Sequence, residues 1–472
     1  MSTAADIIVV GGGPAGAEAA LAAAEHGLAA TLLDEAPQAG GQVYRAPPRA
    51  FAGADADPAG VRLRERLAAS TVTTRFEHIV WSVSPGFRVD ALGPDGPASW
   101  SARAVIAATG AQERVIPFPG WTLPGVVGLA GATIMLKSDG MLPGEQTLVA
   151  GQGPLLLAVA AGILKAGGKV AGLVDLATRA DWLADWRALA SRPDLAARGA
   201  RWRARLLQAG VPVLHRHALR RVEEAPQNRL RVAIGRVDGD GRPVAGPPLE
   251  RIVDAVAVGN GLTASTDITR LLRVEHHYDA LRGGWVPTLD AALRSSMPGL
   301  YVAGDGAGIA GAAAAAIDGR LAGLAAARAL GAVAPDAYRS STAALRTQAR
   351  RARRFGAAMA RLMALRPAQV AGISAETIVC RCEDVTRAEI DAAAADGART
   401  VNQLKAWTRC GMGPCQGRIC GDVAGALLAG ESGARPSAGY FTGRTPFRPL
   451  PLNLLAAEID YATLALPPPA PL

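Results

Sequence analysis

The chain has 472 residues, of which 50% are hydrophobic and only 4% aromatic, and it carries 55 glycines and a formal net charge of +9. This length suits two or three domains, and the composition favours tightly packed α/β layers over an aromatic-rich β-sandwich. The basic residues are nearly all arginines spread along the chain, so we expect no nucleic-acid partner. We find no run of about 18 strongly apolar residues and no signal-like start, so we expect a cytoplasmic protein without a membrane span.

The amino terminus has the pattern of a dinucleotide-binding turn. An apolar strand over residues 6–10 leads into Gly11-Gly12-Gly13-Pro14-Ala15-Gly16, and a helix-forming segment follows. The first glycine of the motif permits the tight turn, the second lets the backbone approach a pyrophosphate, and the third lets helix and strand pack closely. The amino end of that helix offers unpaired N–H groups to phosphate oxygens. The cofactor contacts predicted here are Gly11, Gly13, Pro14, Ala15 and Gly16.

Further segments extend this site. A second strand over residues 30–33 ends in Asp34, whose carboxylate can accept hydrogen bonds from ribose hydroxyls, and Glu35 is an adjacent substitute. Three small-residue turns follow strands elsewhere in the chain, and the last of them precedes an alanine-rich helix. For the acidic residue in that last turn, Asp305, the alternative role is a helix N-cap. The contacts predicted in the three turns are Gly41, Gln42, Thr109, Gly110, Gly304 and Asp305.

With these motifs the chain resembles the two-dinucleotide-binding-domain flavoproteins of the glutathione-reductase-like superfamily. The resemblance implies an α/β fold that binds FAD at the amino-terminal turn, with Gly304-Asp305 returning to it and an NAD(P)-type domain inserted between. Disulfide reductases of that superfamily keep a cysteine pair near the flavin, whereas no cysteine of this chain precedes Cys380. The carboxyl end also lacks an obvious catalytic His–Glu pair. We therefore exclude disulfide reduction by a pyridine nucleotide.

The middle of the chain repeats the unit of strand, glycine turn and helix. A strand over residues 145–150 precedes Gly151-Gln152-Gly153-Pro154-Leu155-Leu156, and the next strand ends in Asp175, which disfavours a 2′-phosphate. Leu156 replaces the third glycine, so helix and strand must move apart or find a compensating small residue. NAD(P), another adenine nucleotide and an empty, vestigial site all remain open. The contacts predicted here are Gly151 and Gly153.

All five cysteines lie within one stretch of 41 residues that contains glycine-rich loops. Two capping-box patterns, at residues 386–389 and 400–403, predict helices between these loops. Backbone N–H groups near helix ends can then point at sulfur, and four clustered thiolates suit an iron–sulfur cluster or a zinc ion. The cysteines are Cys380, Cys382, Cys410, Cys415 and Cys420.

This segment resembles the small helical bacterioferritin-associated-ferredoxin-like (BFD-like) [2Fe-2S] domain, in its C-x-C plus C-x4-C form. The resemblance leaves out Cys410, whose position usually carries a small apolar residue, and we interpret it as a buried spare thiol. Zinc on the same four thiolates remains the alternative. The metal ligands that the resemblance implies are Cys380, Cys382, Cys415 and Cys420.

Across its whole length the chain resembles a branch of FAD-binding proteins that includes components of opine oxidase, hydrogen cyanide synthase, hydroxyproline dehydrogenase and the sarcosine oxidase alpha chain. The FAD domain, the insertion and the cysteine module occur in the same order. The resemblance implies an FAD- and [2Fe-2S]-containing electron-transfer subunit of a heteromeric enzyme that oxidises C–N bonds of amino or imino acids. Its partners would be a D-amino-acid-oxidase-like flavoprotein subunit, which handles the substrate, and optionally a small ferredoxin-like subunit.

Two alternatives stay open, and no catalytic residue is assigned. One is a self-contained NAD(P)H-dependent flavin reductase that passes electrons through its cluster, and the other is an assembly scaffold with empty nucleotide sites. The expected domains are a discontinuous FAD domain (1–114 and 286–335), an inserted NAD(P)-type Rossmann-like domain (115–285), a helical linker (336–372), a BFD-like [2Fe-2S] domain (373–430) and a carboxyl-terminal tail (431–472).

Overall fold

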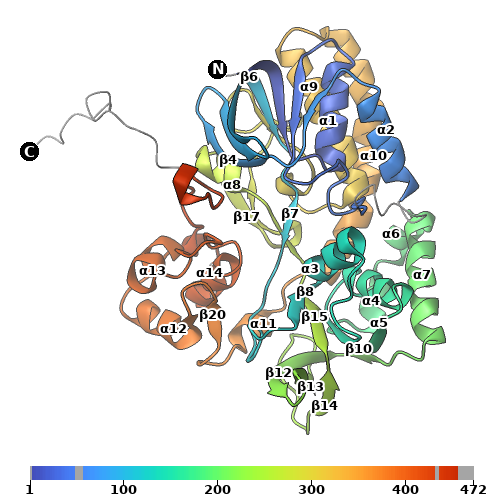
Figure 1. Cartoon of the computed structure of the whole chain (residues 1–472), viewed down its shortest axis with the longest axis vertical. Coiled ribbons are helices and arrows are strands. Elements are labelled where there is room, and N and C mark those ends of the chain that lie inside the picture. Colours follow the sequence, from blue (N-terminus) through green and yellow to red (C-terminus); the bar gives the residue numbers. More distant parts are fainter. Residues whose placement is uncertain (1–2, 48–56, 431–434, 455–472) are drawn as a thin grey trace, which may run out of the picture.

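A computed structural model describes residues 3–47, 57–430 and 435–454 (Figure 1). The expected tail thus lies partly outside the described residues, at 431–434 and 455–472. Two α/β layers lie one above the other, and a small helical module lies beside them (Figure 1). Within the described ranges, no helix combines the length and the apolar character needed to cross a bilayer.

The first sheet has seven strands in the order β3-β2-β1-β6-β5-β4, with β19 also paired to β6. Ile7 and Ile8 point to opposite faces of β1 and both are fully buried, as a parallel strand covered on both sides requires. β19 joins from far downstream, so two separate parts of the chain build this layer. The strands are β1 Thr3–Val10, β2 Ala30–Leu33, β3 Thr73–Arg75, β4 Ile79–Ser84, β5 Arg88–Gly93, β6 Gly96–Ala107 and β19 Leu300–Val302.

Helices rich in small residues cover this sheet, and α1 and α9 pack in very close contact (Figure 1). A Cβ atom added at Gly319 on α9 would lie 1.9 Å from the carbonyl oxygen of Ala15 on α1. One added at Gly323 would lie 2.4 Å from that of Ala19. The many alanines and glycines of the chain therefore bring two helix backbones together behind the amino-terminal turn. The helices are α1 Pro14–Ala24, α2 Pro58–Ala68, α9 Ala312–Ala329 and α10 Pro335–Leu362.

The second sheet is parallel, in the order β11-β10-β9-β15-β8, and a three-stranded antiparallel sheet, β12-β13-β14, adjoins it. Leu156, at the third-glycine position, is fully buried in a cluster with Leu129 and Ile163. Gly259 on β15 leaves room for Leu129, since an added Cβ would lie 2.8 Å from its Cδ1. A glycine on another strand therefore makes room for Leu129, a member of the same cluster as Leu156. The strands are β8 Val126–Gly128, β9 Gln146–Gly151, β10 Lys169–Asp175, β11 Val213–His215, β12 His217–Ala225, β13 Arg229–Arg236, β14 Leu249–Val253 and β15 Ala255–Gly259.

The chain crosses between the two layers on a pair of antiparallel strands, β7 Ala111–Glu113 and β16 Leu262–Ala264. A hairpin of β17 and β18 follows the return. These crossovers place the carboxyl ends of both parallel sheets toward the space between the layers. The remaining elements are α3 Leu129–Ile134, the π-helical turn Met135–Asp139, α4 Leu155–Lys165, α5 Arg179–Ala184, α6 Trp186–Ala190, α7 Pro193–Gln208, α8 Asp267–Leu271, β17 His276–Asp279 and β18 Gly284–Pro287.

The helical module follows α10 and the short helix α11. Both predicted capping boxes are confirmed: Thr386 pairs reciprocally with Glu389, and Thr400 with Gln403. They start α12 and α13, and the glycine-rich loop between α13 and α14 carries three of the five cysteines. The elements are α11 Pro367–Ala371, β20 Ile378–Cys380, β21 Val385–Thr386, α12 Arg387–Ala395, α13 Val401–Thr408 and α14 Gly421–Ala429.

Candidate functional site

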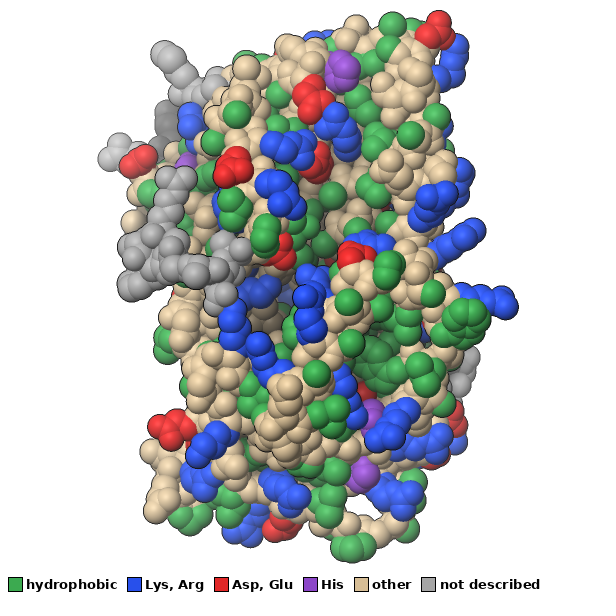
Figure 2. All heavy atoms as spheres, turned by 90° about the vertical axis from the view of Figure 1, so that its right-hand side faces the viewer, with side chains coloured by type: hydrophobic (Ala, Val, Ile, Leu, Met, Phe, Trp, Pro, Cys, Tyr) green, Lys and Arg blue, Asp and Glu red, His purple; other side chains and the backbone are tan. Residues whose placement is uncertain are grey.

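A single cavity of about 2850 Å³ extends between the two α/β layers and reaches the helical module. On the face formed by α2, α6 and α7, lysine and arginine side chains surround a hollow (Figure 2), and Lys137, Arg192 and Arg198 line the cavity. Such a rim favours an anionic ligand. The sequence-predicted residues that line the cavity are Gly11, Gly13, Pro14, Ala15, Asp34, Glu35, Gly41, Gln42, Thr109, Gly110 and Asp305; those that do not are Gly16, Gly304, Gly151 and Gly153.

The amino-terminal turn has the space that a pyrophosphate requires. Gly11 has a φ of +107°, and an added Cβ would lie 2.3 Å from the carbonyl oxygen of Ala108. Gly16 is a packing residue, because its added Cβ would lie 1.7 Å from the oxygen of Gly11. Gly13 differs, because a Cβ atom added there would approach only Gly41 Cα, at 3.8 Å. No side chain caps the helix that Gly13 begins. The free N–H groups of α1 therefore face open space, and the turn fits FAD.

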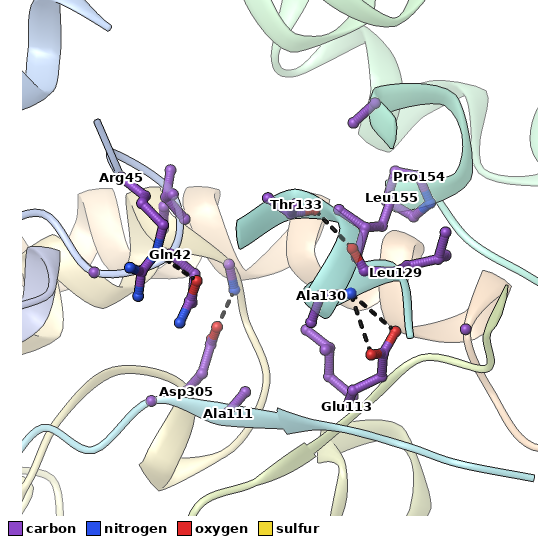
Figure 3. Close-up of a pocket in the computed structure, with 18 of the residues that line it drawn as sticks. Gln42, Arg45, Ala111, Glu113, Leu129, Ala130, Thr133, Pro154, Leu155 and Asp305 are labelled. Atoms are coloured by element: carbon purple, nitrogen blue, oxygen red, sulfur yellow. Dashed lines mark hydrogen bonds between the residues drawn. The ribbon is translucent and has the colours of Figure 1, made fainter. Parts of the chain in front are cut away.

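Two carboxylates organise the loops around this space. Asp34 accepts hydrogen bonds from the backbone N–H groups of Ala36, at 2.6 Å, and of Gly12. Asp305 accepts from Ala310, at 2.9 Å, and from Gly311, at 3.0 Å (Figure 3). Burial raises the pKa of both groups, and these backbone donors oppose the rise. Asp305 is not the N-cap of α9, which is Gly311; its carboxylate instead holds the loop before that helix, and it also borders the cavity.

The second glycine turn is closed by another part of the chain. A Cβ atom added at Gly153 would lie 2.5 Å from Met363 Cγ, and one added at Gly261 would lie 3.0 Å from Met363 Cβ. The amide of Gln152 donates to the carbonyl oxygen of Met363 at 3.0 Å, which fixes the chain there. The residue just beyond the end of α10 therefore occupies the space in front of the turn. Among the described residues, no side chain occupies the space in front of Gly13 as Met363 does in front of Gly153.

The acidic residue of this second unit is also engaged by the protein. Asp175 is buried and accepts hydrogen bonds from Trp182 Nε1, at 3.0 Å, and from the N–H of Ala177, at 2.9 Å. His215 Nδ1 lies 3.5 Å from its carboxylate. Burial raises the pKa of Asp175, and the indole donor opposes the rise. Both oxygens of Asp175 thus accept hydrogen bonds from the protein, as those of the half-buried Asp34 do, but one of the donors to Asp175 is a side chain.

Several residues that border the cavity were not anticipated from the sequence. The N–H of Ala130 donates to both carboxylate oxygens of Glu113, at 3.1 Å each (Figure 3), so the crossover strand β7 is tied to α3. Burial raises the pKa of Glu113 to about 7, against the lowering effect of that donor. Arg45 contacts Gln42 and Ser138, at 3.0 and 3.2 Å. These side chains join the two layers, and no local motif marks them.

The cysteines form two groups. The Sγ atoms of Cys380, Cys410 and Cys420 all lie within 4.8 Å of one another, and all three residues are buried. Cys382 and Cys415 are partly exposed and lie together, with the backbone N–H of Cys415 donating to the Cys382 sulfur. The four predicted ligands thus fall into an inner pair, Cys380 with Cys420, and an outer pair, Cys382 with Cys415. Two pairs of thiolates suit the two irons of a [2Fe-2S] cluster.

Cys380, Cys410 and Cys420 form the inner group, and its negative charge is concentrated on one sulfur. Hydrogen bonds from the thiols of Cys410 and then Cys420 lower the pKa of Cys380 to about 2, and the N–H of Gly411 adds to this. Interaction with Cys380 in turn raises the pKa of Cys420 well above its ordinary value. Burial raises the pKa of Cys382, and its neighbour Cys415 adds to the rise through its thiol. Such thiols lose their protons readily only when a metal binds them.

The cysteine module opens onto the same cavity as the amino-terminal turn. Arg381, which lies between two predicted ligands, and Arg418 and Ile419, which lie between the other two, all line it. Arg418 Nε is 3.0 Å from Asp267 Oδ2, and the buried Arg114 pairs with Asp422 on α14 at 2.9 Å. These ion pairs join the module to the return crossover and to the segment after β7. Residues next to the predicted ligands in sequence therefore border the cavity, although none of the five cysteines lines it.

Comparison with known proteins places the chain in a family. Residues 5–320 match the family described as pyridine nucleotide-disulphide oxidoreductase. The chain belongs to this family of oxidoreductases. Residues 374–459 match a second family, the sarcosine oxidase A3 domain, so an additional carboxyl-terminal domain follows the two-dinucleotide-binding-domain fold. The family name does not bring disulfide chemistry with it, since the matched region contains no cysteine.

Relatives match nearly the whole chain. The A component of the opine oxidase of Rhizobium meliloti is 34% identical over 96% of this chain and 99% of its own length. The hydrogen cyanide synthase component HcnB of Pseudomonas aeruginosa is 32% identical over 94% and 97%. The sarcosine oxidase alpha chain of Corynebacterium sp. is 27% identical over 96% of this chain but only 45% of its own length. The predicted family resemblance is confirmed.

Solved structures show the same fold. L-proline dehydrogenase from P. horikoshii has a TM-score of 0.67 at 20% identity, covering 97% of this chain and 80% of that one. Thioredoxin reductase from T. acidophilum has a TM-score of 0.51 at 20% identity, covering 70% and 100%. The second comparison leaves about a third of this chain uncovered although it covers all of the other one, which agrees with a two-layer flavoprotein fold that carries an added domain.

Proposed function

We propose that this chain is the FAD- and [2Fe-2S]-containing electron-transfer subunit of a heteromeric oxidoreductase that acts on C–N bonds of amino or imino acids. FAD takes up electrons in pairs and can release them singly, whereas a [2Fe-2S] cluster carries one electron at a time. In this proposal Gly11 and Gly13 hold the pyrophosphate of FAD. The thiolates of Cys380, Cys382, Cys415 and Cys420 hold the cluster.

The observation that carries the proposal is the shared cavity. Arg381 and Arg418 alternate in sequence with the predicted ligands, and they border the same space as Gly13 and Asp305. Electron transfer between two bound groups needs a short path through protein, and two sites whose neighbouring residues border one cavity lie near each other.

The alternative of a self-contained NAD(P)H-dependent reductase has less support. It needs a nicotinamide nucleotide at the second glycine turn, where Met363 stands against Gly153. It also needs the carboxylate of Asp175 for a ribose, and that carboxylate is buried against Trp182. We therefore propose that electrons enter from a partner rather than from a nucleotide bound by this chain.

The partner proposal rests on the relatives. The proteins most fully covered by the match are named as subunits of opine oxidase and hydrogen cyanide synthase. We assign no catalytic base to this chain, which suits an assembly in which a second, D-amino-acid-oxidase-like flavoprotein oxidises the substrate. A small ferredoxin-like subunit is a further option. The amino or imino acid is left to experiment.

The test is an anaerobic analysis of the chain purified alone and together with the product of a co-expressed partner gene. Iron, acid-labile sulfide, zinc and flavin are measured per chain, and the visible spectrum is titrated first with NADH and then with opines, D-amino acids and hydroxyproline. We expect flavin, two irons per chain and bleaching by an amino-acid-type substrate only in the complex. Stoichiometric zinc without iron, or rapid bleaching of the isolated chain by NADH, would contradict the proposal.

A further inference from the structure

The long helix α10 packs beside α9 (Figure 1) and separates the cavity from the outside of the protein. Phe355, Gly356 and Met359 on one of its faces line the cavity. A Cβ atom added at Gly356 would lie 2.2 Å from the carbonyl oxygen of Ala310, so the helix backbone lies directly against the loop that Asp305 holds. Only one helix therefore stands between the candidate flavin space and whatever contacts the outer face of α10.

That outer face carries charge of a single sign. Residues 337–362 contain seven arginines and no acidic residue, whereas the whole chain has 50 basic and 41 acidic residues. Three of the seven pair with carboxylates, and they are Arg339, Arg353 and Arg361. The other four have no carboxylate partner among the described residues, and they are Arg346, Arg350, Arg351 and Arg354.

The exposed arginines follow the spacing of one helix side. Arg346, Arg350 and Arg354 recur at intervals of four residues, and Arg361 comes seven residues later, so the four side chains form a stripe about 22 Å long. We call these four residues the arginine stripe. Like charges four residues apart on a helix repel each other, and no described carboxylate on α10 beyond Asp336 offsets that repulsion. Negative charge from a second molecule would relieve it.

An exposed tryptophan stands at the end of the arginine stripe. Arg361 pairs with Asp185 at 2.7 Å, and the next residue, Trp186, is 60% exposed. The guanidinium of Arg187 lies 5.4 Å from the centre of the Trp186 ring. Tryptophan and arginine are both enriched where proteins bind each other, with the aromatic ring as anchor. A protein surface can use the ring and the charges, whereas a phosphate backbone would use only the charges.

We propose that the arginine stripe and Trp186 form the docking surface for an acidic face of the substrate-oxidising flavoprotein subunit. This inference rests on the proposed function, because it requires that partner. A second copy of this chain does not fit, since a two-fold contact would place two arginine stripes against each other. A partner docked here is separated from the cavity by the thickness of one helix, about 10 Å.

The test measures the affinity of the purified, D-amino-acid-oxidase-like flavoprotein subunit for the whole chain, over a range of salt concentrations. Arg350→Glu combined with Arg354→Glu should weaken binding about tenfold to a hundredfold and reduce its dependence on salt. Arg350→Lys combined with Arg354→Lys keeps the charge and should bind nearly as the wild type does. Arg231→Glu combined with Arg251→Glu, at exposed positions on β13 and β14, makes the same change in net charge and is the matched control.

A second variant tests the apolar end of the surface. Trp186→Ala should weaken binding about tenfold, because it removes the aromatic anchor. Flavin and iron per chain and the thermal unfolding of every variant show whether the fold is kept. If the glutamate pair at positions 350 and 354 unfolds the helix, Arg350→Gln combined with Arg354→Gln gives the same comparison without reversed charge.

Unchanged affinity in the folded glutamate variant would overturn this inference and leave the proposed function standing, because the complex would still form. A wild-type chain that does not bind the flavoprotein at all ends both together. Self-association of the chain and binding of a short DNA duplex are measured in parallel. If the glutamate pair at positions 350 and 354 abolished either of these while flavoprotein binding stayed unchanged, the arginine stripe would serve that other occupant and the inference would be wrong.

Discussion

The two glycine turns of this protein have nearly the same local sequence but offer different space. At the first turn, a Cβ atom added at Gly13 would approach only Gly41 Cα, at 3.8 Å, and the turn opens into the cavity. At the second turn, a Cβ atom added at Gly153 would lie 2.5 Å from Met363 Cγ. Their acidic partners differ less: Asp34 and Asp175 both border the cavity, but Asp175 is buried and accepts a hydrogen bond from the side chain of Trp182. A nucleotide-binding motif thus describes a backbone shape, and whether a ligand can use it depends on what packs in front.

The largest expected effect comes from filling the open turn. Gly13→Val puts a branched side chain where the backbone should approach the pyrophosphate, so we expect the variant to retain no flavin after desalting. Flavin absorbance per chain after desalting measures it. Gly239→Ala, at an exposed position with nothing within 4 Å, is the matched control. A fully flavinated valine variant would show that the two turns do not differ as proposed.

The next effect concerns Glu113, which ties the two layers together. Its pKa in the folded protein is about 7, above the ordinary value of 4.5, because burial disfavours the charge. The folded state therefore binds this proton more tightly than the unfolded chain does. The stabilising contribution is complete below pH 4.5 and is lost as the pH rises to about 7, at a cost of roughly 3 kcal/mol.

Denaturant unfolding across this pH window measures the effect. Glu113→Gln has no titrating group at this position, so its stability should fall less than that of the wild type between about pH 4.5 and 7. If the free energy of unfolding changed with pH in the same way in both proteins, the pKa of Glu113 would lie near its ordinary value. The carboxylate would then not be desolvated between the layers.

A smaller effect separates the two acidic residues. Asp175→Ala leaves Trp182 Nε1 and the N–H of Ala177 without their acceptor, so we expect a loss of about 2 kcal/mol of stability and unchanged flavin content. Asp34→Ala should instead lower flavin occupancy. Thermal unfolding and flavin content are measured on both variants. Equal loss of flavin in both would indicate that both turns serve the same bound cofactor.

The smallest expected effect is at Met363, the side chain in front of the second turn. Met363→Ala should raise the affinity for NADH or ATP only about threefold to tenfold, because the backbone of the linker stays in place through Gln152. Equilibrium dialysis measures it, and Met412→Ala, at an exposed position of the cysteine module, is the control. Tight nucleotide binding by the wild type would refute the view that this turn is closed.

The sequence by itself determined the features that depend on neighbours in the chain. The strand, glycine turn and helix around Gly13 and the capping boxes at Thr386 and Thr400 are local, because backbone sterics and i-to-i+3 hydrogen bonds fix them within a few residues. The order of the segments was enough to identify the family. The clustering of the cysteines likewise pointed to a metal site.

Only the tertiary structure decided the features that join distant segments. Met363 reaches Gly153 from 210 positions away in the numbering, and Glu113 acquires its raised pKa from burial against α3. Cys410 lies beside Cys380 and Cys420 because the end of α13 and the start of α14 meet there. Such contacts are set by how whole layers pack, and no local pattern of residue types specifies which side chain will fill a given space.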